Sequence, residues 1–311
     1  MNFPIYFDSK NSLNLYGLKK DFYFLSNLYS IRKLPKVLML SGLKGCGKST
    51  LINHFLFSIF DLANYNKDKL RILETSILLK QLKNNIFQNI IYLQGSELKS
   101  IKVEDIRKLK SKILQSSIIN KERFIILDDV ELFNTNSLNA LLKIIEEPSK
   151  KNYFILINNK TKPLIDTIKS RCLEMKVILN ESKRIEIITK LINFYKLETI
   201  LDPNQSKLTP GNFLKFNYIC YENKISLKNN FSDNLSLLLN LYKKNKETVF
   251  INLVFYLADF FFKELKHNNV IENDKFYEDK AFVLNNLNKF FTFNLSQNSL
   301  INAINSKLNY G

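Results

Sequence analysis

The stretch with the clearest chemical potential is GLKGCGKST, residues 42–50. It holds three of the chain's seven glycines and fits the pattern G-x-x-x-x-G-K-[ST] of a phosphate-binding loop. Successive backbone N–H groups of such a loop turn toward a phosphate, which requires backbone angles and a close approach that side chains obstruct. We expect Lys48 to reach the terminal phosphates of a nucleotide and Ser49 to offer its hydroxyl to Mg²⁺. The weaker alternative is an ordinary glycine turn followed by a chance Lys-Ser.

The stretch FIILDD, residues 124–129, supplies the acid that such a loop needs. Asp128 is expected to hold the shell of the Mg²⁺ ion. The next position often carries a glutamate that activates water, whereas this chain has Asp129, which is one methylene shorter. Because a general base must reach the proton that it removes, Asp129 is a weak candidate for that role. Taken alone, the two acids could also be a solvated turn at the end of a strand.

These residues need a rigid frame, which the pattern of the first 178 residues predicts. Short apolar, β-branched runs alternate there with amphipathic stretches, which indicates βαβ units and a parallel sheet covered on both faces. The helix that follows the glycine-rich loop would point its N-terminal dipole at a bound anion. The predicted fold class is α/β, and the expected strands are residues 36–41, 89–94, 123–129, 153–159 and 173–179.

After about residue 180 the strand signals fade. Residues 181–196 have apolar side chains at helical spacing, and residues 201–212 collect turn formers. Long segments rich in Leu and Phe follow from about residue 225. We therefore predict a nucleotide-binding domain over residues 1–178, a small helical domain over 179–224 and a second helical domain over 225–311.

The cysteines and the longest apolar run indicate the compartment. Cys46, Cys172 and Cys220 lie far apart in the sequence, which excludes a disulfide-rich scaffold and a CxxC zinc site. The apolar run at residues 250–262 is interrupted by Asn252 and is too short to span a bilayer, so we expect a buried helix and no membrane partner. The N-terminal residues lack the pattern of a signal peptide. A reduced, cytoplasmic protein is the expectation.

The net charge of +17 has two interpretations. It would suit a nucleic-acid partner. However, the chain is rich in Lys, Asn, Ile, Phe and Tyr, whose codons are rich in A and T, so a bias of the genome could supply much of the basicity. The charge alone does not decide between these two interpretations.

Residues 127–172 resemble bacterial clamp-loader subunits of the AAA+ class. The most specific pieces are NALLKIIEEP at residues 139–148 and SRC at residues 170–172. The resemblance extends upstream through IKVEDIRKLKSKI to the phosphate-binding loop and covers most of residues 35–178. It implies an AAA+ P-loop domain with a parallel sheet, followed by a small helical lid domain and a C-terminal helical collar domain.

Within that class, three departures from the ATP-hydrolysing motor subunits favour the delta-prime type of DNA polymerase III. Asp129 stands where a motor has glutamate, and residues 61–100 lack the cysteines of the motors' zinc module. Asn212 stands where a motor offers an arginine to the nucleotide. The resemblance then implies weak or absent ATPase activity of its own, in a hetero-oligomeric ring with motor and clamp-opening subunits that places a sliding clamp on primed DNA.

The same resemblance assigns roles to individual residues. Asn158 or Asn159 would be the polar sensor beside the terminal phosphate, and Ser49 and Asp128 would form the metal position. Arg171 of SRC would act in trans as an arginine finger on a neighbour's nucleotide. The cofactor would be ATP or ADP with Mg²⁺, and no zinc is expected. The loop residues implied to bind the nucleotide are Gly42, Gly45, Cys46, Gly47, Lys48, Ser49 and Thr50.

Three alternatives stay open at this point. The chain could be a gamma/tau-like motor ATPase of the loader, a free-standing P-loop kinase acting on a nucleotide, or a structural subunit that never binds nucleotide. A kinase would need an arginine-rich lid and would not need SRC, while the intact loop argues against a purely structural role. These alternatives differ in whether the protein is catalytic as a monomer or acts only within a hetero-oligomer.

Overall fold

The computed structural model describes residues 3–84, 86–95, 101–114, 121–227, 230–268 and 273–308, with the backbone alone at residues 273 and 274. The chain forms two compact units. The α/β unit spans Asn2–Leu197 and Asp202–Leu214. The helical unit consists mainly of Glu198–Leu201 and Lys215–Gly311, so helix α9 (Pro210–Glu222) contributes residues to both.

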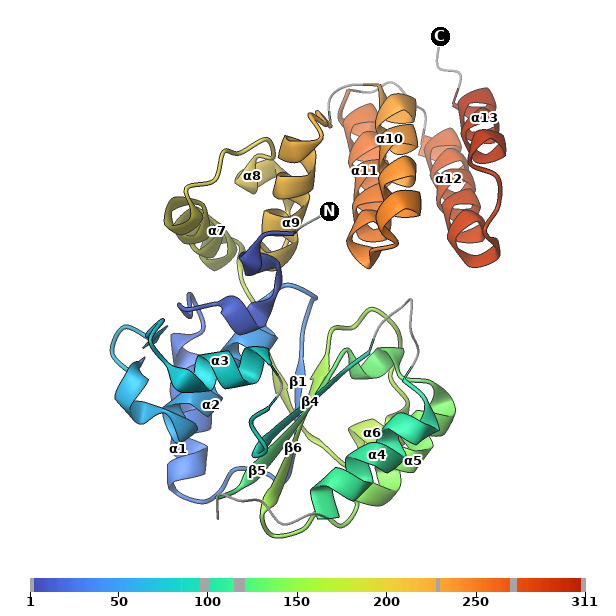
Figure 1. The fold of residues 1–311 in the computed structure, drawn as a ribbon. Helices are drawn as coiled ribbons and strands as arrows, with labels where there is room; N and C mark the ends of the chain where they lie inside the picture. The colour runs from blue at the N-terminus through green and yellow to red at the C-terminus, as the bar shows by residue number, and fades with distance from the viewer. Residues whose placement is uncertain are drawn as a thin grey trace. The chain divides into compact units, whose positions relative to one another are not determined.

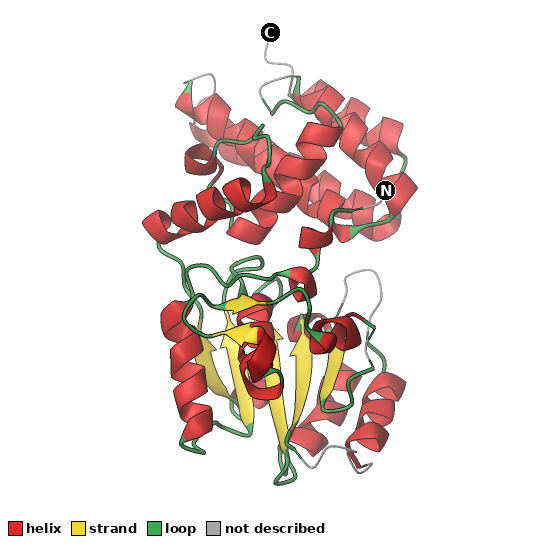
Figure 2. Ribbon diagram, turned by 60° about the vertical axis from the view of Figure 1, so that its left-hand side comes forward, coloured by secondary structure: helices red, strands yellow, loops and turns green. Residues whose placement is uncertain are grey.

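A five-stranded parallel sheet forms the centre of the α/β unit (Figure 2). Because carboxyl ends of parallel strands share one edge of a sheet, the loops that follow the strands meet there. Each of the five expected runs overlaps one strand, which confirms the predicted α/β class. In spatial order the strands are β4 (Ile90–Gln94), β5 (Arg123–Asp128), β6 (Asn152–Asn158), β1 (Val37–Ser41) and β7 (Leu173–Lys176).

Helices cover both faces of this sheet (Figure 1). Successive side chains of a strand point to opposite faces, so Leu38 and Leu40 of β1 pack toward one layer while Val37 and Met39 pack toward the other. Both layers exclude water from the central strands of the sheet, which residues 37–41, 123–128 and 152–158 form, and their largely apolar sequences predict this burial. The first layer holds α1 (Lys19–Ser30), α2 (Lys48–Phe60) and α3 (Ile77–Lys83), and the second holds α4 (Val103–Leu114), α5 (Thr135–Ile145) and α6 (Asp166–Lys169).

Short elements join these layers. The strands β2 (Tyr65–Asn66) and β3 (Arg71–Ile72) form a small antiparallel sheet. The 3₁₀ turns are η1 (Ile5–Phe7), η2 (Ser9–Asn11), η3 (Leu62–Asn64) and η4 (Val130–Leu132). η2 lies beside α2 and α3, and η4 follows directly after the acidic end of β5.

The last part of the α/β unit is helical. α7 (Glu181–Tyr195) begins after Asn180, whose side chain caps it by accepting a hydrogen bond from the N–H of Lys183. The buried Arg184 of α7 donates to the carbonyls of Leu208 and Pro203 and so fixes the following segment. That segment, which the sequence indicated to be rich in turns, contains α8 (Pro203–Ser206) and the start of α9. Proline opens both helices, because it suits the first helical position.

Four long helices make up most of the helical unit: α10 (Phe231–Asn245), α11 (Thr248–His267), α12 (Asn273–Phe293) and α13 (Gln297–Lys307). α10 packs against α11 and α13, and α12 packs against the same two helices. The expected buried helix at residues 250–262 is confirmed as part of α11, whose inner face includes Leu253, Leu257 and Phe262. Among the described residues, no helix combines the length and apolarity needed to cross a membrane.

Candidate nucleotide-binding site

The phosphate-binding loop connects β1 to α2 and depends on its glycines. At Gly42, an added Cβ would lie 2.3 Å from the carbonyl oxygen of Val177. Gly45 has φ +85°, and a Cβ there would lie 2.5 Å from the hydroxyl of Thr209. Larger residues at either position would displace backbone or the start of α9. The close packing of the loop therefore explains two of its glycines, and Gly47, with φ +98°, has a backbone conformation that other residues rarely adopt.

Lys48 is the first residue of α2 and is almost completely buried. Its ammonium donates hydrogen bonds to the carbonyl oxygens of Gly42 at 2.6 Å and Leu43 at 2.9 Å. Burial lowers the pKa of Lys48. Among the residues that the structure describes, no carboxylate lies within 4.0 Å of this ammonium. A buried cation with neutral acceptors favours an anionic ligand, because a charge removed from water needs an opposite charge.

Asp128 presents the opposite charge a short distance away. One oxygen of its buried carboxylate, Oδ2, accepts hydrogen bonds from Ser49 Oγ at 2.8 Å and from the hydroxyl of Tyr92 at 2.6 Å. Burial and the neighbouring charge of Asp129 raise the pKa of Asp128. Within the described parts of the chain its hydrogen-bond donors are all neutral. A hydroxyl beside an unpaired carboxylate suits the oxygen preference of Mg²⁺.

These side chains therefore fit a magnesium nucleotide. One set of residues would bind the phosphates, and a different set would bind the metal ion. Lys48 and the N–H groups of the loop would bind phosphate oxygens, while Ser49 and Asp128 would hold the ion. When bound, Mg²⁺ would neutralise part of the charge on the phosphates. Cys46 is buried with its sulfur facing the carbonyl of Val177, and Thr50 lies half-buried in the first turn of α2.

Asp129, the weak base candidate, is already engaged. It has a left-handed backbone with φ 51°. Its Oδ1 lies 3.2 Å from Nζ of Lys44 and accepts a hydrogen bond from Asn159 Nδ2 at 2.8 Å. Gln94 Nε2 donates to the other oxygen at 3.4 Å. A carboxylate held by a cation and two amides is a poor acceptor for a proton from water.

The two asparagines at the end of β6 differ in their surroundings. The side chain of Asn159 reaches both acids, donating to Asp129 and, at 3.4 Å, to Asp128 Oδ1. The side chain of Asn158 accepts a hydrogen bond from the N–H of Lys160 and stays within its own turn. Of the two candidate sensors, the structure thus brings only Asn159 to the carboxylates.

Arg171 lies apart from this cluster. Its Nε and Nη2 both contact Oε1 of Glu146, at 2.8 and 2.7 Å, and Nη1 donates to the carbonyl of Thr167. Its side chain is 37% exposed to solvent. These contacts join the end of α6 to the EEP segment after α5. The structure therefore places Arg171 on the surface with its guanidinium held in one orientation.

The start of α9 lies directly on the phosphate-binding loop. The hydroxyl of Thr209 donates to the carbonyl of Lys44 at 2.6 Å, and the N–H of Gly211 donates to the carbonyl of Gly45 at 2.8 Å. Asn212 follows, and its N and Oδ1 would lie within 3.2 Å of a Cβ on Gly45. Asn212 thus occupies the position beside the loop that the sequence indicated, with a short neutral side chain.

Sequence reasoning missed Tyr92 and Lys44. Tyr92 is the one polar aromatic residue in the run NIIYLQ, and Lys44 is an unspecified position of the loop motif. A tyrosine in the middle of a mainly apolar strand was an available signal. The partner of Tyr92 was not, because it depends on the register of β4 against β5, in which Tyr92 lies opposite Ile126 and Gln94 opposite Asp128. The partner of Lys44 depends on the order of β5, β6 and β1 in the sheet.

Comparison with known proteins identifies the family of the chain. The sequence profile described as DNA polymerase III, delta subunit, matches residues 18–180, more than half of the chain. The chain belongs to the DNA polymerase III delta subunit family. The match covers the loop, both acids and Arg171, and so agrees with the resemblance carried by residues 127–172.

Relatives of this delta-family chain include two kinds of subunit. A DNA polymerase III subunit gamma from Buchnera aphidicola of Acyrthosiphon pisum is 28% identical over 185 residues, which cover 59% of the chain and 49% of the relative. A subunit delta' from Pseudomonas aeruginosa is 37% identical over 76 residues, 24% of the chain and 23% of the relative. The chain spans about half the length of the gamma subunits that it matches.

A solved structure is also similar to the chain. It is a gamma subunit-related protein of DNA polymerase III from Thermotoga maritima, with 15% identity and a TM-score of 0.45. The match covers 91% of this chain and 97% of that protein.

Proposed function

We propose that the chain is a delta-prime-like subunit of the DNA polymerase III clamp loader and that it binds ATP or ADP with Mg²⁺ at residues 42–50. The observation that carries the nucleotide site is a pair of buried charges, neither of which has a direct ion-pair partner among the described residues. The ammonium of Lys48 has only neutral acceptors, and the carboxylate of Asp128 has only neutral donors among the described residues. A phosphate and its metal ion would complement both.

We infer that hydrolysis at this site is slow or absent. Asp129 is bound by Lys44 and Asn159, so it is poorly available to activate water. Asn212 beside the loop carries no charge to offer a phosphate. The exposed Arg171 would instead serve the nucleotide of a neighbouring ATPase subunit. The partners are then other loader subunits in a hetero-oligomeric ring in the cytoplasm, and through that ring the sliding clamp and primed DNA.

The second candidate is a gamma/tau-like motor ATPase of the same loader. The complete phosphate-binding loop and the relatives named gamma favour it. The two candidates differ in turnover, since a motor hydrolyses ATP as part of its work. The engaged Asp129 and the neutral Asn212 support the delta-prime-like assignment.

The test begins with the isolated chain. We expect ADP and ATP to bind in the presence of Mg²⁺, with turnover well below about one per second, the low end of enzyme rates. The chain should co-purify with candidate loader subunits, and the complex should show an ATPase stimulated by clamp and primed DNA. Rapid turnover by the pure chain would favour the motor. Failure to bind nucleotide at any Mg²⁺ concentration would refute the site itself.

A further inference from the structure

Tyr92 contacts the candidate metal position from outside the motifs. It lies on the edge strand β4, two residues before the end of that strand. Its hydroxyl donates to Asp128 Oδ2 at 2.6 Å, the same oxygen that accepts from Ser49 at 2.8 Å. Two hydroxyls from different elements thus converge on one carboxylate oxygen. This arrangement leaves the carboxylate little freedom to rotate.

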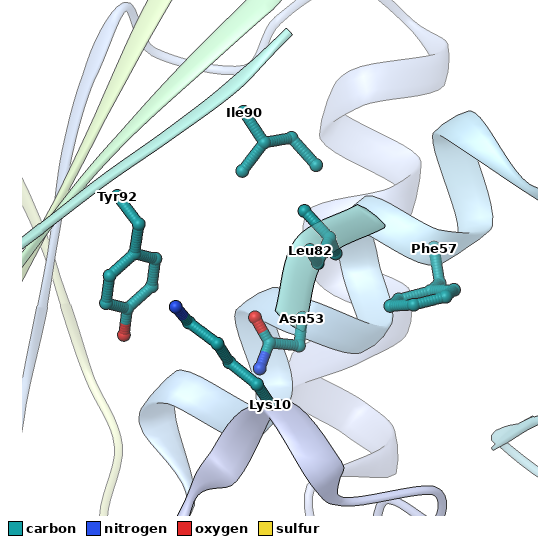
Figure 3. Close-up of a pocket in the computed structure, with 6 residues that line it drawn as sticks. All are labelled: Lys10, Asn53, Phe57, Leu82, Ile90 and Tyr92. Atoms are coloured by element: carbon teal, nitrogen blue, oxygen red, sulfur yellow. The ribbon is translucent and has the colours of Figure 1, made fainter. Parts of the chain in front are cut away.

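The ring of Tyr92 has a contact of its own away from the carboxylate. It forms one wall of a pocket lined by Lys10 of η2, Asn53 and Phe57 of α2, Leu82, Ile90 and Tyr92 (Figure 3). The ammonium of Lys10 lies 4.6 Å from the ring centroid, a favourable distance for a cation–π contact. Asn53 follows Ser49 by one helical turn and donates to the carbonyl of Ser9. The contact from Lys10 therefore comes from a turn that α2 anchors through Asn53.

The other oxygen of Asp128 is held less strongly. Oδ1 accepts from the N–H of Asp129 at 2.9 Å and from Asn159 at 3.4 Å. Without the tyrosine hydroxyl, Ser49 would be the remaining donor to Oδ2 among the described residues. The negative charge of Asp129 would then push the carboxylate away from its present orientation.

We propose that Tyr92 is a positioning residue that holds the carboxylate of Asp128 in the orientation in which Ser49 and Asp128 together accept the Mg²⁺ of a bound nucleotide. This inference rests on the proposed nucleotide site. A group that orients a metal ligand typically changes metal affinity by about 10- to 100-fold when it is removed. The expected effect falls on the metal, because Lys48 and the loop N–H groups bind phosphate without Tyr92.

The experiment compares Tyr92→Phe with the wild-type chain. Mg²⁺ is titrated against each protein with a fluorescent ADP analogue, and nucleotide affinity is measured separately in EDTA. We expect the half-saturating Mg²⁺ concentration to rise about 10-fold or more in Tyr92→Phe, while affinity in EDTA stays the same. A matched control is Tyr153→Phe, because Tyr153 stacks on Phe124 in the same unit, away from the carboxylates. Its Mg²⁺ curve should follow the wild type.

A double-mutant cycle adds a second readout. If Tyr92 acts through the carboxylate of Asp128, then Tyr92→Phe should have no further effect on Mg²⁺ dependence in an Asp128→Ala background. In one outcome, the wild type binds Mg-nucleotide and gives the same Mg²⁺ curve as Tyr92→Phe. That result would overturn the role of Tyr92 and leave the proposed function intact. An equal loss of affinity with and without Mg²⁺ would also overturn it, since that result indicates a general structural effect. A wild type that binds no nucleotide would overturn both proposals.

Discussion

The length of the side chain at position 129 is only part of what argues against a role for Asp129 as the general base. The sequence suggests a lack of reach, since aspartate is one methylene shorter than glutamate. The structure adds an ion pair with Lys44, a residue of the phosphate-binding loop itself, and a hydrogen bond from Asn159. Because Asp129 keeps only 3% of its exposure, this pair is poorly screened by water. Lengthening the side chain alone would therefore leave the base engaged.

This reasoning predicts an unequal response to two substitutions. Asp129→Glu alone should leave hydrolysis slow, whereas Asp129→Glu combined with Lys44→Met should raise single-turnover hydrolysis of bound ATP by about 10-fold or more, because a general base contributes about 10² to 10⁴ in rate. The control is Asp129→Glu with Lys33→Met, which removes an exposed lysine outside the loop. Rates are measured with the protein in excess over ATP, so that all of the nucleotide is bound. If both double variants hydrolyse ATP equally slowly, the Lys44 pair is not what limits the base.

Some individual residues of the candidate site could be predicted from the sequence. The loop residues and Asp128 carry their identity in a local motif, so no tertiary information was needed. The choice between Asn158 and Asn159 required knowing where β6 ends, since successive side chains there point in different directions. The contacts of Tyr92 and Gln94 required the pairing of β4 with β5, and the contact of Lys44 with Asp129 required the order of β5, β6 and β1 in the sheet. Local patterns specify neither.

Among the elements, the start of α9 contacts the phosphate-binding loop directly. Thr209 and Gly211 donate to the carbonyls of two successive loop residues, Lys44 and Gly45. Any change in the path of the loop backbone must lengthen or break these hydrogen bonds. The strands were predictable because buried parallel strands are uniformly apolar. α8 was not, because its four residues lie among turn formers and its position depends on the distant Arg184.

We predict that the hydroxyl of Thr209, and not its size, secures this contact. Thr209→Val keeps the shape of the side chain but removes the donor to Lys44, so the free energy of unfolding should fall by about 1 kcal/mol. Thr209→Ser keeps the donor and should lose less. Urea unfolding followed by circular dichroism measures both. Equal losses in the two variants would mean that the methyl group, through packing, is what matters.

For the whole molecule, buried titratable groups set how stability depends on pH. His54 is completely buried in α2, with its ring nitrogens 3.1 Å from the hydroxyl of Tyr65 and from the carbonyl of Ser12. Burial lowers the pKa of His54 to about 4. In the unfolded chain a histidine has a pKa of about 6.5. Between these values the unfolded state binds more protons, so stability is present above pH 6.5 and is lost as the pH falls toward 4.

The contribution of His54 should be about 3 kcal/mol across that window, since each pKa unit corresponds to about 1.4 kcal/mol. His54→Gln should therefore show a smaller fall in unfolding free energy between pH 7 and pH 4 than the wild type, whatever its stability at pH 7. The chain's other histidine, His267, is exposed at the end of α11 and supplies the control. His267→Gln should keep the wild-type pH dependence. A His54→Gln profile parallel to the wild type would contradict the assignment.

The last prediction concerns the chain within an assembly and tests the role proposed for Arg171. The exposed ion pair with Glu146 contributes little to stability, so Arg171→Ala should fold and assemble normally. The guanidinium that Glu146 and Thr167 hold in place would be lost to the neighbouring site.

An arginine finger acting in trans contributes about 10³ to 10⁵ in rate at the site that it serves, although a ring with several sites would lose less in total. Clamp-stimulated ATPase and clamp loading by the reconstituted complex should therefore fall with Arg171→Ala. Arg171→Lys should restore them only partly, because an ammonium lacks the planar fork of donors. Lys169→Ala is the matched control, since it removes a neighbouring exposed cation of α6 that pairs with Asp166. Wild-type loading by an intact Arg171→Ala complex would show that Arg171 only joins the end of α6 to Glu146.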